Sequence, residues 1–265
     1  MNDIPFLAEH GQLTFRWAHV VAGVLWIGVL YFFNWINGAF AATMDADTKK
    51  KVVPELMPRA LFWFRWGAAW TWITGVALLF VMYYVPTSPN FYGPLSENAG
   101  TNPEVTTWAI PFAALFVGFI LYDQIFKNLP HNVGVILWGG IALGYGYLLN
   151  GVLEASGRAT LIHIGGLFGT AMAANVWMRI WPAQKRIITA TKEGNAPDPA
   201  DPALAGLRSK HNTYMSVPLL LFMVAVNQPS ITGSDNVLLW AAVTLVVGFV
   251  ATFAIYKKVP SVKGF

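Results

Sequence analysis

The stretch Phe15-Arg16-Trp17-Ala18-His19-Val20-Val21-Ala22-Gly23-Val24-Leu25-Trp26-Ile27-Gly28 opens an apolar segment that is long enough to cross a bilayer. At 3.6 residues per turn, His19 and Gly23 share one helical stripe. A titratable side chain at membrane depth is costly and marks a functional site by default, and the glycine one turn away leaves room beside it. This stretch therefore predicts a membrane helix with a ligand-binding histidine. The alternative is that His19 hydrogen-bonds a neighbouring helix and Gly23 lets two backbones approach.

Composition places the chain in the membrane and restricts the cofactors. The sequence is 55% hydrophobic and 11% charged, whereas soluble domains are about 25% charged. There is no cysteine, which excludes disulfides, iron–sulfur clusters and covalently attached haem. A redox metal would need histidine, methionine or oxygen ligands. No basic patch of the kind that binds nucleic acid is present.

Hydropathy predicts an all-α bundle of seven transmembrane helices within a single domain, 1–265, whose surroundings are membrane lipids. The expected spans are 13–37, 60–85, 108–126, 132–150, 159–181, 213–228 and 236–257. A mobile cytoplasmic loop is expected over 182–212, where proline, alanine and aspartate are frequent.

Basic residues sort to alternate connections between the spans. Fifteen of the seventeen lie on one side, and Arg16 and Arg158 alone lie on the other. The positive-inside rule then places the N-terminus outside and the C-terminus in the cytoplasm, as seven spans require. The outer side is acidic, which suits docking of a basic soluble partner. The alternative is a solvated rim without a partner. The carboxylates of the outer side are Asp3, Glu9, Glu97, Glu104, Glu154 and Asp235.

This topology puts His19 and His163 at a similar depth in the outer half of the membrane. Each histidine has a glycine close by on its helix, Gly23 beside His19 and Gly166 beside His163. Small residues below an imidazole suit a flat macrocycle between helices. We therefore expect His19 and His163 as metal ligands of a haem b, either both together or one with the opposite coordination site open. The alternative is that the glycines serve helix packing alone.

Two further histidines, His131 and His211, open the fourth and sixth spans at the cytoplasmic side. They would hold a second haem b near the inner surface. The alternative is that both are simply helix starts.

Polar residues in the inner halves of the spans are secondary candidates. Arg65 and Asp123 are expected to form a structural salt bridge between the second and third spans. The alternative role of Arg65 is to bind a haem propionate or an anionic substrate. Asn34 is a second substrate candidate.

Several motifs resemble the membrane domain of the bacterial membrane-bound urate oxidases (urate hydroxylases). They are Arg16-Trp17-Ala18-His19 through Asn34, Arg65-Trp66 with Thr71-Trp72-Ile73-Thr74-Gly75, His163-Ile164-Gly165-Gly166 through Val176, and Ser209-Lys210-His211-Asn212-Thr213-Tyr214 followed by Pro218. The resemblance covers nearly the whole chain. It implies a multi-pass protein of the bacterial inner membrane that oxidises urate and works with a c-type cytochrome.

Members of that family typically carry an eighth helix and a C-terminal cytochrome c domain, and the sequence shows neither beyond the seventh span. The resemblance therefore implies that electrons pass through a histidine-ligated haem to a separate periplasmic cytochrome c. Two other functions stay open. The chain would be a haem-b membrane anchor that relays electrons for a separate dehydrogenase subunit, or a transporter whose histidines line a path.

Overall fold

The computed structural model of the protein describes residues 3–85 and 89–262, with side chains from residue 10 onward. Within these ranges the chain is helical, and its single β-bridge joins Tyr92 to Ala155. The all-α prediction is confirmed.

The helices follow one another with short connections, and several include a π-helical segment. In chain order they are α1 (Asp3–Tyr31), η1 (Phe32–Asn37), α2 (Gly38–Thr43), α3 (Ala46–Leu79), η2 (Phe80–Tyr84), α4 (Val105–Asn128), α5 (His131–Tyr147), η3 (Leu148–Val152), α6 (Gly157–Asn175), η4 (Val176–Ile180), α7 (Trp181–Lys192), α8 (Ala200–Ala225), α9 (Pro229–Thr232), α10 (Val237–Lys258) and the 3₁₀ turn η5 (Val259–Ser261).

Six helical segments of the described chain are long and apolar enough to cross a membrane: His10–Thr43, Ala46–Tyr84, Val105–Asn128, His131–Val152, Gly157–Lys192 and Val237–Ser261. Residues 213–225 of the expected span 213–228 belong to α8. This helix is not among the six, because its first half contains polar residues such as Arg208 and Lys210. The seventh span and the orientation of the termini stay predictions.

The expected loop at 182–212 is largely helical. Residues 182–192 belong to α7 and residues 200–212 belong to α8, so the connection is reduced to residues 193–199. The prediction of a loop here was wrong, because hydropathy detects membrane crossing and is blind to polar helices outside the apolar spans.

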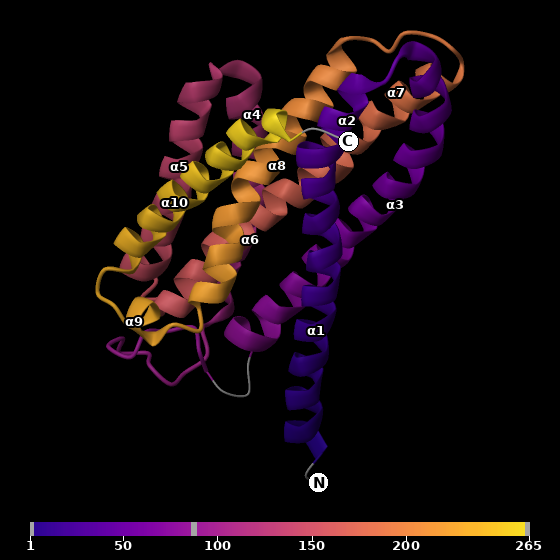
Figure 1. Ribbon diagram of the computed structural model, residues 1–265. Helices are drawn as coiled ribbons and strands as arrows, with labels where there is room; N and C mark the ends of the chain where they lie inside the picture. The colour runs from indigo at the N-terminus through magenta and orange to yellow at the C-terminus, as the bar shows by residue number, and fades with distance from the viewer. Residues whose placement is uncertain (1–2, 86–88, 263–265) are drawn as a thin grey trace.

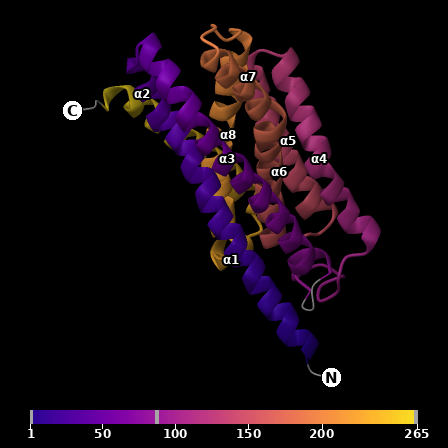
Figure 2. The same ribbon diagram turned by 90° about the vertical axis from the view of Figure 1, so that its right-hand side faces the viewer.

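The central element is α6, which packs against α3, α4, α5 and α8. Of the most apolar 18 residues in its span, 78% are buried, whereas the corresponding share is 22–39% in the other five spans. Figures 1 and 2 show α1 and α3 side by side along one flank of the bundle. We call the end where α4 meets α5 the basic end and the end that carries α9 the acidic end (Figure 1).

Glycines allow the closest helix contacts. A Cβ at Gly67 of α3 would lie 3.1 Å from the backbone N of Trp26, and one at Gly248 of α10 would lie 2.6 Å from Cδ of Pro218. These contacts seat α3 on α1, and α10 on the proline-bearing part of α8. They fix the framework that surrounds the pocket described next.

Candidate functional site

A cavity of about 340 Å³ lies between α1, α3, η2, α6 and the end of α8. This volume falls within the ~300–1,000 Å³ of small-molecule and cofactor sites. Its walls are mostly apolar, and its polar side chains are few. They are Arg16, His19, Thr71, Tyr83, Arg158, Thr170 and Asn227. We call this cavity the His19 pocket.

His19 is half-buried on the wall of the pocket, and its ring is held by α3. Nδ1 lies 2.9 Å from the carbonyl oxygen of Thr71 and 3.2 Å from Oγ1 of Thr74. Because a carbonyl only accepts, Nδ1 carries the proton and Nε2 keeps the lone pair. No described residue hydrogen-bonds Nε2. Metal-bound histidines commonly have this arrangement, with the second ring nitrogen donating to a carbonyl.

Gly75 provides the space for the His19 ring. A Cβ at this position would lie 3.0 Å from Cε1 and 3.3 Å from Nδ1 of the imidazole. On the opposite wall, Gly166 lines the pocket with Gly165 and Gly169. Gly23 does not line it, and a Cβ there would lie an ordinary 3.8 Å from Cγ2 of Thr71. The role expected for Gly23 therefore belongs to Gly75.

The two basic residues that the charge pattern set apart from all others both line the pocket. Nη2 of Arg16 donates to the sulfur of Met82 at 3.2 Å. Arg158 lies beside the Tyr83 hydroxyl, and its Nε is buried with no hydrogen-bond partner among the described residues. Neither arginine forms an ion pair with a described carboxylate. Together they give a mostly apolar cavity an unneutralised positive charge.

The structure does not bring His163 to the pocket. Its ring is fully buried, with Nδ1 2.7 Å from the carbonyl oxygen of Ala159 and Nε2 2.7 Å from the hydroxyl of Tyr84. The carbonyl fixes the proton on Nδ1, so Nε2 accepts from Tyr84. Both nitrogens are occupied, and no lone pair is left for a metal. The expected pairing of His19 with His163 is therefore not formed in this structure.

His131 and His211 do meet, as their places in the topology indicated. Nε2 of His211 lies 3.3 Å from Nδ1 of His131, and the rings stack with centroids 5.0 Å apart. Two imidazoles on opposite sides of one iron need nitrogens roughly 4 Å apart, twice the metal–nitrogen bond. The direct contact leaves no place for a haem between them.

A hydrogen-bonded network continues from His211 into the core. Its Nδ1 lies 2.8 Å from the hydroxyl of Tyr122, which also accepts from Nδ2 of Asn175 at 2.9 Å. Asn175 donates in addition to Oδ1 of Asn212. We call His131, His211, Tyr122, Asn175 and Asn212 the inner network. It joins α4, α5, α6 and α8 at the basic end.

The expected salt bridge between Arg65 and Asp123 is absent. Asp123 pairs instead with Arg179 at 2.6 Å and with Arg208 at 2.9 Å. Arg65 does not line the His19 pocket. Its guanidinium carbon lies 3.9 Å from the ring centroid of Trp181. Its expected role toward a propionate or substrate in this pocket is not supported.

Asn34 lies outside the pocket and joins helices. Its Nδ2 donates to the Leu30 carbonyl and to Oγ of Ser209, and its Oδ1 accepts from the hydroxyl of Tyr256. These bonds use both ends of the amide. The substrate role expected for Asn34 is therefore not supported.

Met82 and Tyr83 line the pocket and were not singled out from the sequence. Both belong to η2, whose π-helical register sets their direction. A π-helical turn carries an extra residue and is frequent at functional sites, but hydropathy does not reveal it. The described residues contain no cluster of three or more metal-ligating side chains. A metal in this pocket would therefore depend on His19 and on its own additional ligands, as haem iron does.

Comparisons with known proteins identify the family. No curated protein and no solved structure matches the chain. The family model described as urate oxidase N-terminal matches residues 44–260. This range includes the pocket walls from α3, α6 and α8, whereas Arg16 and His19 on α1 precede it. The chain belongs to the urate oxidase N-terminal family of membrane proteins.

Proposed function

We propose that this chain is the membrane part of a urate-oxidising redox system, in which the His19 pocket holds haem b. The observation that carries the proposal is the state of His19. Its Nδ1 is anchored on the Thr71 carbonyl, its Nε2 is without a described partner, and the ring lines a cavity of about 340 Å³. A neutral imidazole fixed in this way is prepared to ligate a metal.

The remaining walls fit a flat, mostly apolar group that carries carboxylates. Gly165, Gly166 and Gly169 line one side of the pocket and place no side chain in it. Arg16 and Arg158 are the groups that would hold propionates, because guanidinium pairs well with carboxylate. A haem b held here would supply a one-electron carrier between urate and an acceptor. Urate itself is polar on every edge, so the apolar walls favour the cofactor over the substrate as the occupant.

The acceptor in this proposal is a separate c-type cytochrome that docks at the acidic end. Glu97, Glu104, Glu154 and Asp235 are all exposed there, on the connections that precede α4, α6 and α10. Negative charge on this face would steer a basic cytochrome and raise its association rate. The two basic residues expected on this side, Arg16 and Arg158, both line the His19 pocket.

The test is a dithionite-reduced minus oxidised spectrum of detergent-purified protein, recorded for the wild type, His19→Ala and His131→Ala. We expect a b-type signal in the wild type and in His131→Ala, and its loss in His19→Ala. Loss in His131→Ala with retention in His19→Ala would overturn the assignment and move the haem to the inner network.

Anaerobic addition of urate then separates the two redox functions. If urate converts the haem to its reduced form, and so produces the b-type difference spectrum, the chain oxidises urate. If dithionite reduces the haem and urate does not, the chain is the haem-b anchor of a separate dehydrogenase. A colourless wild-type protein after haem-replete expression would reject both.

A further inference from the structure

Arg65 is a cation within the span of α3 that has no carboxylate partner. Asp123 is taken by Arg179 and Arg208, and no described carboxylate lies within ion-pair distance of Arg65. Its Nε is buried without a hydrogen-bond partner among the described residues. An unpaired charge at membrane depth is costly, so a counter-charge from outside the chain would stabilise it.

Aromatic rings fix the guanidinium of Arg65 without neutralising it. Its central carbon lies 3.9 Å from the ring centroid of Trp181, 5.8 Å from that of Phe62 and 5.9 Å from that of Trp177. The indole nitrogen of Trp177 also donates to the backbone oxygen of Arg65 at 3.1 Å. Such cation–π contacts orient the planar fork and leave its N–H groups available to an acceptor.

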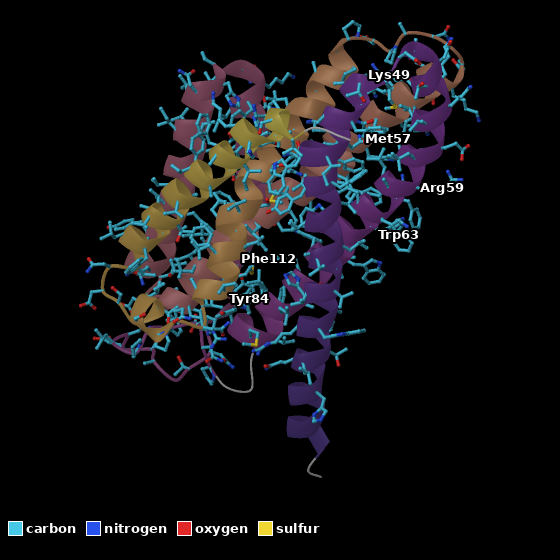
Figure 3. All side chains as sticks on the ribbon, viewed as in Figure 1. Lys49, Met57, Arg59, Trp63, Tyr84 and Phe112 are labelled. Atoms are coloured by element: carbon cyan, nitrogen blue, oxygen red, sulfur yellow. The ribbon has the colours of Figure 1, made fainter. Side chains whose placement is uncertain are left out.

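The same stretch of α3 presents an exposed apolar surface. Phe62, Trp63, Trp66 and Trp70 are 43%, 56%, 39% and 55% exposed. Figure 3 shows Trp63 projecting from α3 away from the bundle, with Arg59 nearer the basic end on the same helix. Exposed tryptophans are typical of the membrane interface, where one part of the ring is in hydrocarbon and the N–H reaches the headgroups.

A second cation, Lys185, lies on α7, the helix that begins with the Trp181 over whose ring the Arg65 guanidinium lies. Lys185 is one helical turn beyond Trp181 and is exposed, with no described carboxylate within ion-pair distance. Its neighbour Arg186 differs, because it is paired with Asp201. Two unneutralised cations are thus associated with Trp181: Arg65, which lies over its ring, and Lys185, which follows it by one turn of α7.

We propose that Arg65 and Lys185 form a binding site for the phosphate of an acidic phospholipid, whose acyl chains lie along the exposed aromatic face of α3. The phosphate diester would accept the guanidinium N–H groups and neutralise the charge that Asp123 leaves unpaired. A lipid fits better than free phosphate, because the apolar surface beside the cations has a matching partner only in a lipid tail. This inference is independent of the redox proposal.

Native mass spectrometry of the delipidated protein tests the site, with phosphatidylglycerol and phosphatidylcholine added in parallel. The variants are Arg65→Gln, Lys185→Gln and the matched control Arg59→Gln. Arg59 lies on the same helix and is highly exposed, but it is already paired with Glu55. We expect preferential binding of phosphatidylglycerol by the wild type, and about ten-fold weaker binding in Arg65→Gln. Arg59→Gln should bind like the wild type.

The result that overturns the proposal is equal binding of the two lipids, or an equal loss in Arg59→Gln and Arg65→Gln. Either would indicate a general lipid coat. Competition by inorganic phosphate at the lipid concentration would show that the site recognises a free anion instead. If Arg65→Gln does not fold, Lys185→Gln decides, because an exposed lysine is removed without disturbing the core; unchanged phosphatidylglycerol binding in that variant rejects the site.

Discussion

The two histidine-bearing regions of the bundle use the same side chain in opposite ways. In the His19 pocket, one imidazole nitrogen is anchored and the other has no described partner. In the inner network, both nitrogens of His211 are bonded, one to Tyr122 and one to His131. His163, which is also fully bonded, resembles the inner network although it lies near the acidic end.

The difference separates a binding site from a structural core. A free lone pair on a cavity wall can accept a ligand, whereas a closed network holds helices in register because breaking it leaves buried polar groups without partners. Variants of the inner network should therefore reduce stability, and variants of the His19 pocket should change what the protein binds.

The largest expected effect is at Asp123. Replacement by alanine leaves Arg208, 4% exposed, and Arg179 without their shared carboxylate. Removing one partner of a buried ion pair costs about 3–5 kcal/mol. Thermal unfolding in detergent should show a large loss for Asp123→Ala and a small one for Glu55→Ala, whose ion pair with Arg59 is exposed. Equal effects would mean that the buried cluster does not hold the basic end together.

Gly75→Ala should disturb the His19 pocket directly. The added methyl group would lie 3.0 Å from Cε1 of His19, so the imidazole must shift. Overpacking of this kind costs about 1–3 kcal/mol, and we expect weaker retention of haem. Gly23→Ala is the matched control, because its nearest neighbouring atom would be 3.8 Å away. Haem content per chain after purification measures both, and a loss in Gly23→Ala alone would contradict the geometry.

Tyr122→Phe tests the inner network, the second of the two regions compared above. It removes the hydroxyl that contacts His211 and accepts from Asn175, which leaves two buried groups short of a partner. The expected cost is about 1–3 kcal/mol in the free energy of unfolding, with no change in the haem spectrum. A changed spectrum would place the cofactor near the inner network.

The smallest effect concerns Asp201, outside the apolar spans. The Arg186 guanidinium hydrogen-bonds this carboxylate and holds its pKa below the usual 3.8. Because the folded-state pKa is depressed, the ion pair stabilises the protein above pH 3.8 and this contribution is lost as the pH falls through the lower value. Asp201→Asn should therefore reduce the difference in stability between neutral and acid pH, measured by acid unfolding. An unchanged acid profile would show that the ion pair of Arg186 with Asp201 contributes nothing to stability.

Several features followed from the sequence because hydropathy and charge act over whole helices. The all-α fold, six of the spans and the meeting of His131 with His211 depend on length and on position along a helix. The isolation of Arg16 and Arg158 from the other basic residues was also visible, but their shared pocket was not. Whether the two arginines line one pocket depends on how α1 and α6 are rotated about their axes.

The misplaced residues show the same limit. His163 and Gly166 are three residues apart, which on a 3.6-residue turn separates them by about 60°. This is enough for Gly166 to line the pocket while His163 contacts Tyr84. Asp123 was expected to bond Arg65, but Arg179 belongs to the π-helical η4, whose extra residue changes the direction of the side chains that follow.

The central proposal is that one imidazole, that of His19, holds haem b in the His19 pocket, and chemical rescue tests it most directly. His19→Gly should purify as a folded protein without a b-type spectrum, and added imidazole should restore the spectrum by occupying the space of the missing ring. A His19→Gly protein that keeps its haem, or one that stays colourless with imidazole while His211→Gly is rescued, would contradict the assignment.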